Sequence, residues 1–239
     1  MTLPYPTPTR ITSLTDDHGK PQPISARPLV EIAANSSTRY VLVGTGKLLA
    51  DSDIGSNAQQ SFYAIADGIA ASGAFYGSPS QPLPGGVSFP ITRRQLTADT
   101  SLLAGIGSSP ASALGWYFDL PVIANIAQRV NVDPTANQGI AAFIANVPNG
   151  SACSPSGTGT VYAVNFANGQ TVLLNNDLTT PATSIPTSGL GTDVAIVSVD
   201  GKLELYSGGS KGTVAKDPAS LTTAGGVKQI NWRDVPSTN

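Results

Sequence analysis

The sequence has almost none of the side chains that most enzymes use for catalysis. Its 239 residues include one cysteine, Cys153, and one histidine, His18. A single thiol excludes an internal disulfide, and one cysteine with one histidine is too few for a clustered zinc site. A Ser/His/Asp triad needs a histidine beside a carboxylate and an activated hydroxyl, whereas His18 stands in a predicted Asp/Gly turn. We therefore expect a protein with no catalytic residues.

Charge is also scarce. Charged residues make up 12% of the chain, about half the usual globular share, and the net charge is −2. No block of like charges is present, which argues against nucleic acid as a partner. No apolar run approaches the ~20 residues of a membrane span. The first residues, Met1–Pro8, lack the basic and apolar regions of a signal peptide.

What the chain does contain favours strands and turns. Hydrophobic residues reach 40%, and 25 Gly and 19 Pro accompany many Ser, Thr and Asn. The pattern predicts about twelve to fourteen short strands, typical of a β-sandwich or a β-propeller. At roughly 40 to 45 residues per blade, we expect an all-β, propeller-like fold of about three to four blades from a larger ring. A β-sandwich is the alternative.

One β domain is predicted over residues 10–235. The proline-punctuated segment 1–9 and the tail 236–239 are expected to be flexible.

Two hairpins are predicted from their turn residues. Tyr40–Val43, closed by Gly44-Thr45-Gly46, pairs with Ser61–Ala66. Near the end of the chain, Asp200-Gly201 suits a type I′ turn between residues 194–199 and 202–206.

Other segments give single-element predictions. Ile140–Val147 is a more continuous apolar run than the other segments, as fits an inner strand covered on both faces. Phe89–Leu96 predicts a strand, and Thr97–Leu103 a short helical turn with Thr97 as its N-cap. In Arg129–Asp133 the alternation predicts that Val130 and Val132 face inward and that Arg129 faces outward.

The segment from Asp51 to Phe62 superficially suggests a calcium loop. Asp51, Asp53 and Asn57 are weak metal-ligand candidates at its positions 1, 3 and 7. Glycine, however, stands at position 5 rather than 6, and Phe62 occupies position 12, where a bidentate Glu is required. We expect a structural Asx-turn here instead.

Aromatic residues supply the candidate contact sites. A low-complexity stretch, residues 68–86, predicts a long surface loop with Phe75 and Tyr76 in its middle, our candidate partner-binding loop. Trp116, within Gly115–Pro121, is expected in the core or between blades.

Seven short segments, taken in order, resemble the C-terminal propeller of the PilC/PilY family of type IV pilus biogenesis factors and tip adhesins. They span roughly residues 20–235 and are Pro23–Pro28, Gly44–Leu49, Ser52-Asp53, Gln60–Tyr63, Gly115–Leu120, the Cys153–Gly159 loop and Asn231–Asp234. Each segment is weak by itself, but their order is specific.

The resemblance implies structural roles for the motif residues. These are Gly44, Gly46, Ser52, Asp53, Gln60, Ser61, Tyr63, Trp116, Gly157, Gly159, Trp232 and Arg233. The family's calcium loop normally lies upstream of the matched region, so we expect no cofactor in this chain.

The resemblance also implies a function: a non-enzymatic domain that contacts minor pilins at the pilus tip and supports pilus assembly, adhesion and twitching. Host or abiotic surfaces are further candidate ligands. The implied location is exported, at the pilus tip, on the outer surface or in transit through the periplasm. Because no signal peptide is visible, we expect the chain to be a fragment.

Two other functions stay open. A propeller-type glycan-active enzyme would gather two carboxylates in a cleft. A carbohydrate-binding module would expose aromatic rings such as Trp116, Tyr76 or Phe75.

Overall fold

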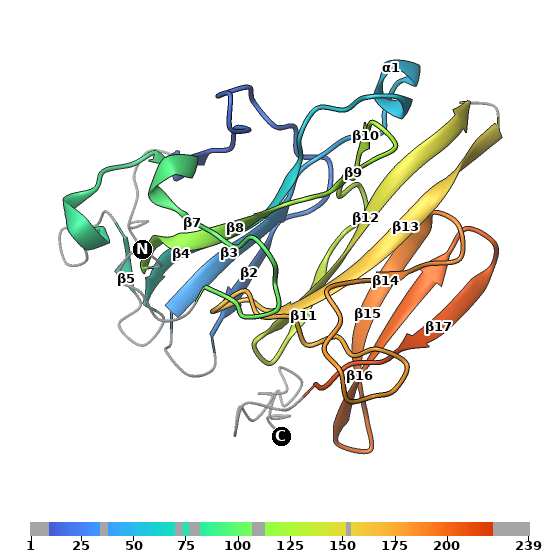
Figure 1. Cartoon of the computed structure of the whole chain (residues 1–239). Coiled ribbons are helices and arrows are strands. Elements are labelled where there is room, and N and C mark those ends of the chain that lie inside the picture. Colours follow the sequence, from blue (N-terminus) through green and yellow to red (C-terminus); the bar gives the residue numbers. More distant parts are fainter. Residues whose placement is uncertain are drawn as a thin grey trace, which may run out of the picture.

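The computed structural model describes residues 10–33, 38–69, 74–76, 82–106, 113–151 and 154–221, with only the backbone for residues 74, 75 and 155. The predicted flexible ends, the predicted last strand, Cys153, Trp232 and Arg233 lie outside these ranges. Regular structure in the described part is nearly all β (Figure 1). Its α-helix, α1 (Asp51–Ile54), has four residues, and no described helix is long and apolar enough to cross a membrane.

The first and largest sheet has six strands. Its order is β2-β3-β4-β8-β7, with β5 added beside β4. The bounds are β2 Leu29–Ile32, β3 Thr38–Gly44, β4 Ser61–Ile69, β5 Ala74–Phe75, β7 Thr97–Ala98 and β8 Gly115–Asp119. The predicted pairing of the strand before Gly44 with the strand from Ser61 is confirmed, since β3 and β4 pair antiparallel.

The second sheet is built on a long hairpin. β12 (Ile140–Ser151) and β13 (Ser154–Asn165) pair along their whole length, with β11 (Thr135–Asn137) and β14 (Ile185–Pro186) at the edges. A third sheet follows, formed by β15 (Gly191–Val199), β16 (Lys202–Gly209) and β17 (Thr213–Asp217). The turn between β15 and β16 has positive φ at Asp200 and Gly201, as a type I′ turn requires, so this hairpin prediction is confirmed.

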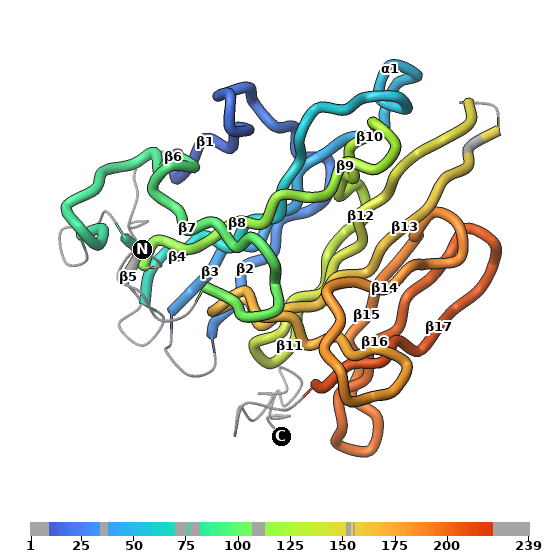
Figure 2. Tube along the Cα trace, in the orientation of Figure 1, coloured from blue at the N-terminus to red at the C-terminus, as the bar shows by residue number. Residues whose placement is uncertain are grey.

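Two small pairings complete the β structure. β1 (Thr12–Ser13) lies parallel to β6 (Ile91–Thr92), and β9 (Val122–Ile123) pairs with β10 (Ile126–Ala127) (Figure 2). A short 3₁₀ turn covers Pro84–Gly86.

Two of the single-element predictions are wrong. The strand expected over Phe89–Leu96 is only β6, because Gln95 Oε1 accepts the Thr92 N–H and turns Arg93–Gln95 into a 3₁₀ turn. The helical turn expected from Thr97 is strand β7, followed by a bend. There the Asp99 carboxylate accepts the N–H groups of Ser101 and Leu102, a local alternative to helix hydrogen bonds.

The three sheets stack face to face on two hydrophobic clusters. On one face of the central sheet, Phe143 stacks on Phe62 of the first sheet with ring centroids 4.0 Å apart, and on Tyr162 at 5.1 Å. On the other face, Ile140 and Ile144 pack in one cluster with core residues of the third sheet. Ile140–Val147 is therefore an inner strand covered on both faces, as predicted.

Consecutive sheets packed in this way confirm the all-β prediction, and the propeller arrangement itself stays a prediction. Three principal sheets agree with the expected three to four units, and their stacking differs from the two layers of a sandwich (Figure 1). Membership of a larger ring stays a prediction.

Candidate functional site

The Gly44-Thr45-Gly46 turn at the end of β3 forms a seat for a distant segment. The Val130 N–H donates to the Thr45 carbonyl, and the Gly46 N–H donates to that of Pro23. A Cβ at Gly44 would lie 2.4 Å from Val130 Cβ, and one at Gly46 would lie 2.3 Å from Arg129 Cβ. Both predicted motif glycines are therefore needed because another backbone segment passes too close for any side chain.

Arg129 is buried, so the prediction that it faces outward is wrong. Its guanidinium donates to the backbone carbonyls of Ala127, Lys47, Asp53 and Ser56, which fold over it. Burial lowers the pKa of this guanidinium, an effect that the nearby Asp53 carboxylate opposes. Arginine nevertheless stays charged at any ordinary pH. A period-two pattern cannot anticipate that a distant loop will bring three carbonyls, those of Lys47, Asp53 and Ser56, to one side chain. Val130, by contrast, faces inward as predicted, and Val132 is half-buried.

Asp53 fixes the same loop from within α1. Its Oδ2 accepts the N–H groups of Leu49 and Ala50 at 2.9 and 3.1 Å, and its Oδ1 lies 2.8 Å from Lys47 Nζ. These contacts, the hydrogen bond from Lys47 first, lower the pKa of the Asp53 carboxyl. The expected Asx-turn is therefore a four-residue helix held by Asp53, and its neighbour Ser52 is exposed.

The three weak metal candidates are placed differently from one another. Asp53 is buried and both of its oxygens are engaged, whereas Asp51 is exposed. Asn57 is exposed too, and its amide donates to Asn125 at 3.5 Å. The Asp51 side chain is thus exposed to solvent, whereas the Asp53 carboxylate is enclosed by its hydrogen-bond partners.

Asp53→Asn is expected to lower the free energy of unfolding at pH 7 by about 1–2 kcal/mol, because an amide nitrogen would face Lys47 in place of a carboxylate oxygen. The folded-state pKa of Asp53 is depressed. Its contribution is therefore present above the unfolded pKa of about 4 and is lost as pH falls through the folded pKa. Urea denaturation of both proteins at pH 7 and pH 3 checks this; a difference that persists unchanged at pH 3 would contradict it.

The loop held by Arg129 and Asp53 forms one wall of the candidate site, and the β12–β13 hairpin forms the second. Asn146 of β12 exchanges backbone hydrogen bonds with Arg129, and its buried side-chain amide binds both the N–H and the carbonyl of Gly191. Leu190 therefore lies against the hairpin at Gly157. A Cβ there would come within 2.6 Å of Leu190 Cδ2 and 2.3 Å of the Val147 carbonyl. A Cβ at Gly159, the other predicted glycine, would lie 2.4 Å from the backbone nitrogen of Gly191.

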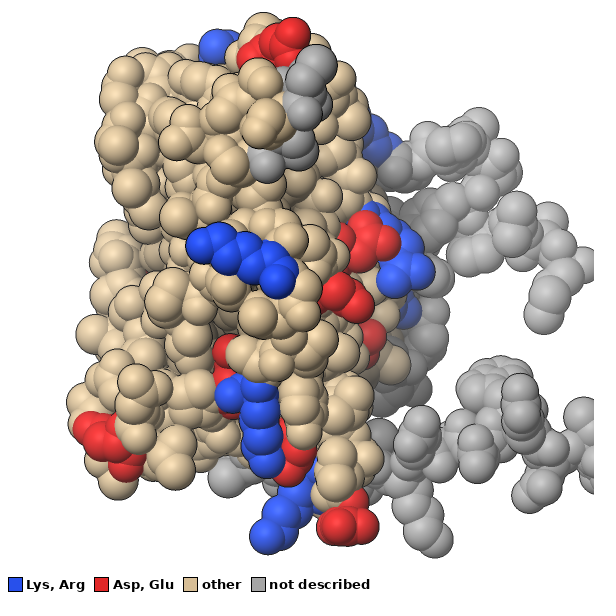
Figure 3. Space-filling model, turned by 90° about the vertical axis from the view of Figure 1, so that its right-hand side faces the viewer, with Lys and Arg blue, Asp and Glu red and all other residues tan. Residues whose placement is uncertain are grey.

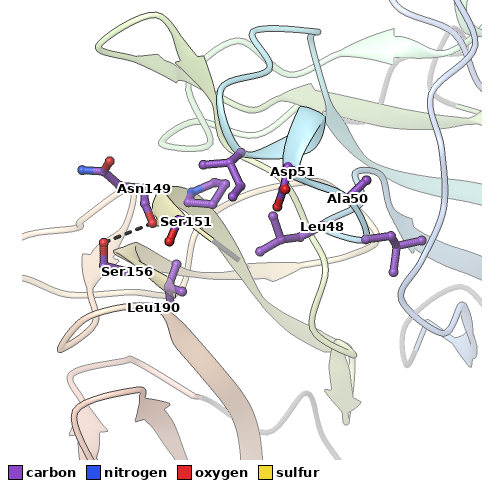
Figure 4. A pocket seen from close by; sticks show the side chains of 10 residues that line it. Leu48, Ala50, Asp51, Asn149, Ser151, Ser156 and Leu190 are labelled. Carbon is purple, nitrogen blue, oxygen red and sulfur yellow. Dashed lines mark hydrogen bonds between the residues drawn. The ribbon is translucent and has the colours of Figure 1, made fainter. Parts of the chain in front are cut away.

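Between these walls lies a groove of about 300 Å³, hereafter the hairpin groove. Leu48 and Asp51 line it on one side, and Asn149, Ser151, Ser156 and Leu190 on the other (Figure 4). The remaining lining residues are Leu49, Ala50, Ile54 and Pro148. Leu49 is 79% exposed, and Asp51 is the one charged residue of the lining. The groove is thus apolar, open and nearly uncharged, which suits a protein side chain better than a charged metabolite.

The other motif residues form a buried polar network away from this groove. Ser61 Oγ donates to Asp119 at 2.6 Å, and Tyr63 Oη donates to Gln22 at 2.6 Å. Arg93 donates to both hydroxyls and pairs with Asp119. Gln60 is also buried and accepts the Leu120 N–H on its carbonyl. This network joins β4, β8 and the N-terminal segment, so its role is to hold the first sheet together.

Two groups of this network, the Tyr63 hydroxyl and the Arg93 guanidinium, have raised pKa values. Burial raises the pKa of the Tyr63 hydroxyl. Burial alone would lower the pKa of Arg93, but the hydrogen bonds to Asp119 and Tyr63 outweigh it and raise the pKa. Both groups therefore keep their protons at neutral pH, as structural groups do.

Two of the aromatic contact candidates, Trp116 and Tyr76, are buried and not exposed on the surface. Trp116 is fully buried, as predicted, and its indole N–H donates to the Phe166 carbonyl. Tyr76 is also buried, and its N–H donates to the Asp67 carbonyl, so its ring is not on the surface; partner binding by the loop of Phe75 and Tyr76 stays a prediction. The side chain of Phe75 lies outside the described part. Two of the three rings on which sugar stacking was predicted are therefore unavailable.

Carboxylates also line a more open hollow beside β16 and β17, which includes Glu204 and Asp217. Asp217 pairs across the strands with buried Leu205, whereas Glu204 contacts Tyr206 and Lys216 on the opposite face of the sheet. Burial raises the pKa of Asp217. Because the two side chains leave opposite faces, they do not converge on one bond as a glycosidase pair does.

Comparisons with known proteins agree with this architecture. No protein-family model matches the chain. The chain is 30% identical over 230 residues to the type IV pilus biogenesis factor PilY1 homolog of Xylella fastidiosa (strain Temecula1 / ATCC 700964), covering 91% of this chain and 18% of that protein. The solved C-terminal domain of Pseudomonas aeruginosa PilY1 superposes with a TM-score of 0.60 at 18% identity, covering 88% of this chain and 48% of that one.

The chain is thus an all-β domain of stacked antiparallel sheets, with the fold of a PilY1 C-terminal domain. The resemblance seen in the sequence is confirmed: the chain is related to the C-terminal region of the PilC/PilY pilus biogenesis factors. It spans less than a fifth of the curated relative and about half of the solved chain.

Proposed function

We propose that this chain is a non-enzymatic domain of a type IV pilus biogenesis factor and that it binds pilus proteins through the hairpin groove. The relationship to a type IV pilus biogenesis factor over 91% of the chain is the observation that carries the proposal. Minor pilins at the pilus tip are the proposed partners. Pilus assembly, adhesion and twitching are the processes it would support, from an exported location.

The use of the motif residues supports a binding role rather than a catalytic one. Gly44, Gly46 and Asp53 shape one wall of the groove, and Gly157 allows the other. The side-chain hydroxyls of Ser61 and Tyr63 are both hydrogen-bonded within the buried network. The motifs therefore maintain a scaffold, and the groove is an exposed feature that this scaffold positions.

The surface chemistry supports protein contact as well. On the face shown in Figure 3, uncharged residues dominate and the few acidic and basic groups are interspersed. Such a surface gives little long-range attraction to a polyanion. Apolar contact in a preformed groove is then the main source of affinity.

Leu48→Asp is expected to weaken binding to the minor pilins of the source bacterium by about ten-fold or more, since it puts a carboxylate at an apolar contact point. Val199→Asp is the matched control and should leave binding unchanged, because Val199 is 42% exposed and ends β15 at the opposite end of the strand from Leu190. The measurement is the binding of each purified variant to surface-immobilised pilins. Circular dichroism verifies beforehand that the pilins and the variants are folded. Equal binding by the two variants would remove the groove from the proposal, and no binding by the wild-type chain would contradict the proposed partners.

A further inference from the structure

The hollow beside β16 and β17 has an apolar lining with one buried carboxylate in it. Its volume is about 540 Å³, within the range of ligand-binding pockets. We call it the leucine hollow after its larger apolar lining residues, which are Leu174, Leu178, Leu203, Leu205, Pro218 and Leu221. Asp217 lines it too and lies on the same face of the third sheet as its cross-strand partner Leu205. The hollow therefore combines apolar contact with a single carboxylate on that face.

One oxygen of the Asp217 carboxylate is free. Asp217 is 5% exposed, and its Oδ2 has no hydrogen-bond partner among the residues that the structure describes. Burial raises the pKa of this carboxyl, an effect that a hydrogen bond from Ser207 opposes. A carboxylate that is buried without a full set of partners is stabilised by a cationic hydrogen-bond donor. Asp217 thus favours a cation as the group that enters the hollow.

The two lysines that line the hollow cannot serve as this cation. Lys216 directly precedes Asp217 on β17 and leaves the opposite face of the sheet, where it pairs with Glu204. Lys202 lies on that face as well, two residues before Glu204 on β16. A metal ion does not fit either, since Asp217 is the one carboxylate that lines the hollow from its face and sites for divalent ions use several oxygen ligands. The hollow is therefore suited to an organic cation.

Leu178 gives the hollow an exposed apolar rim. Its side chain is 64% exposed and its φ is +59°, a left-handed conformation that is rare for a bulky residue. The Leu178 N–H donates to the Asn175 carbonyl. Asp177 Oδ1 accepts the N–H groups of Thr179 and Thr180, both at 2.8 Å, and these bonds hold the turn in this conformation. A strained, exposed leucine beside a free carboxylate is typical of a binding site rather than of core packing.

We propose that the leucine hollow binds a lysine side chain of a partner protein. The ammonium group would donate to Asp217 Oδ2, and the apolar residues that flank the lysine would cover Leu178 and Leu221. Lysine suits the site better than arginine, because one free oxygen matches a point-like donor and not a two-pronged guanidinium. A free amine is a poorer occupant, since a single alkyl chain would leave the exposed rim at Leu178 in contact with water. This inference does not depend on the hairpin groove.

The test is an NMR titration of the full chain with a defined probe, a leucine–lysine–leucine tripeptide with blocked ends. Binding should shift the backbone amide signals of Leu178 and Asp217. Replacing the lysine of the peptide by norleucine, which keeps the alkyl chain and removes the charge, should weaken binding by about ten-fold or more. Asp217→Asn should weaken it to a similar extent. Asp193→Asn, at an exposed position of β15, removes the same charge from the protein and should leave binding unchanged.

Leu178→Asn tests the apolar rim separately. Asparagine tolerates the left-handed conformation, so this variant keeps the turn while it removes the leucine side chain. Binding of the tripeptide should weaken by about ten-fold, because the contact between the rim and the flanking leucines is lost.

Equal binding of the lysine and norleucine peptides would overturn the proposal, and so would equal binding by the wild-type chain and a folded Asp217→Asn variant. Binding of n-butylamine as tight as that of the tripeptide would also overturn it, because the site would then be one for free amines. So would peptide binding that appears only in a Lys228→Gln variant, since the chain's own lysine would then be the occupant. Absence of binding in both the wild-type chain and Lys228→Gln would contradict it outright.

Discussion

Gly46→Ala is expected to lower the free energy of unfolding by about 3–4 kcal/mol, a combination of overpacking and backbone strain. The new Cβ would lie 2.3 Å from Arg129 Cβ and 2.9 Å from its Cα, and the latter atom cannot be moved by a side-chain rotation. Gly46 also has φ of +127°, where a side chain is disfavoured. Urea denaturation followed by circular dichroism measures the loss as a lower midpoint at unchanged slope.

Gly55→Ala is the matched control for this prediction. Gly55 ends α1, close to Gly46 in the chain, but its φ is −96° and a Cβ would meet no atom within 4 Å. We expect a change within about 0.5 kcal/mol. If the two variants were equally stable, Arg129 would not lie on the Gly46 backbone, and the described wall of the groove would be incorrect.

Local patterns predicted the sheets well, because strand periodicity and turn chemistry act over a few residues. The β3–β4 pair, the Asp200-Gly201 hairpin and the doubly covered strand from Ile140 follow from such patterns. One local signal acts against the strand pattern. Thr92 and Gln95 have the spacing of a capping box, and this pair shortens the strand expected over Phe89–Leu96.

The candidate site could not be predicted in the same way, since its walls come from segments about 100 residues apart. The motif glycines were singled out, but what they touch was not: Arg129 lies on Gly46, and Leu190 lies on Gly157. Arg129 in a polar, alternating context is ordinarily expected to be exposed. The signal that could have located it is the pair of close-spaced glycines, which implies an approaching backbone whose identity a single sequence does not reveal.

Arg129→Met is expected to lower the free energy of unfolding by about 3–5 kcal/mol, because it removes the donor from a buried, charge-assisted set of hydrogen bonds. The carbonyls of Lys47, Asp53 and Ser56, which surround the buried Arg129 guanidinium, would lose this donor. Methionine fills much of the same volume, so the loss reports hydrogen bonds more than a cavity. Chemical denaturation gives the stability, and amide exchange over residues 47–56 shows whether the loop loosens.

Arg27→Met provides the contrast that identifies the cause. Arg27 pairs with Asp133 at 3.7 Å with 71% and 55% of the two side chains exposed, so its removal should change stability by less than about 0.5 kcal/mol. Both variants remove one positive charge, and net charge therefore cannot explain a difference between them. Arg129→Met keeps the backbone pairing of residue 129 with Asn146, which holds Gly191 beside Leu190, so the loop of residues 47–56 should loosen while the Leu190 segment stays protected. Loosening of both segments together would mean that the Arg129 side chain, and not its backbone, holds the two walls of the groove in place.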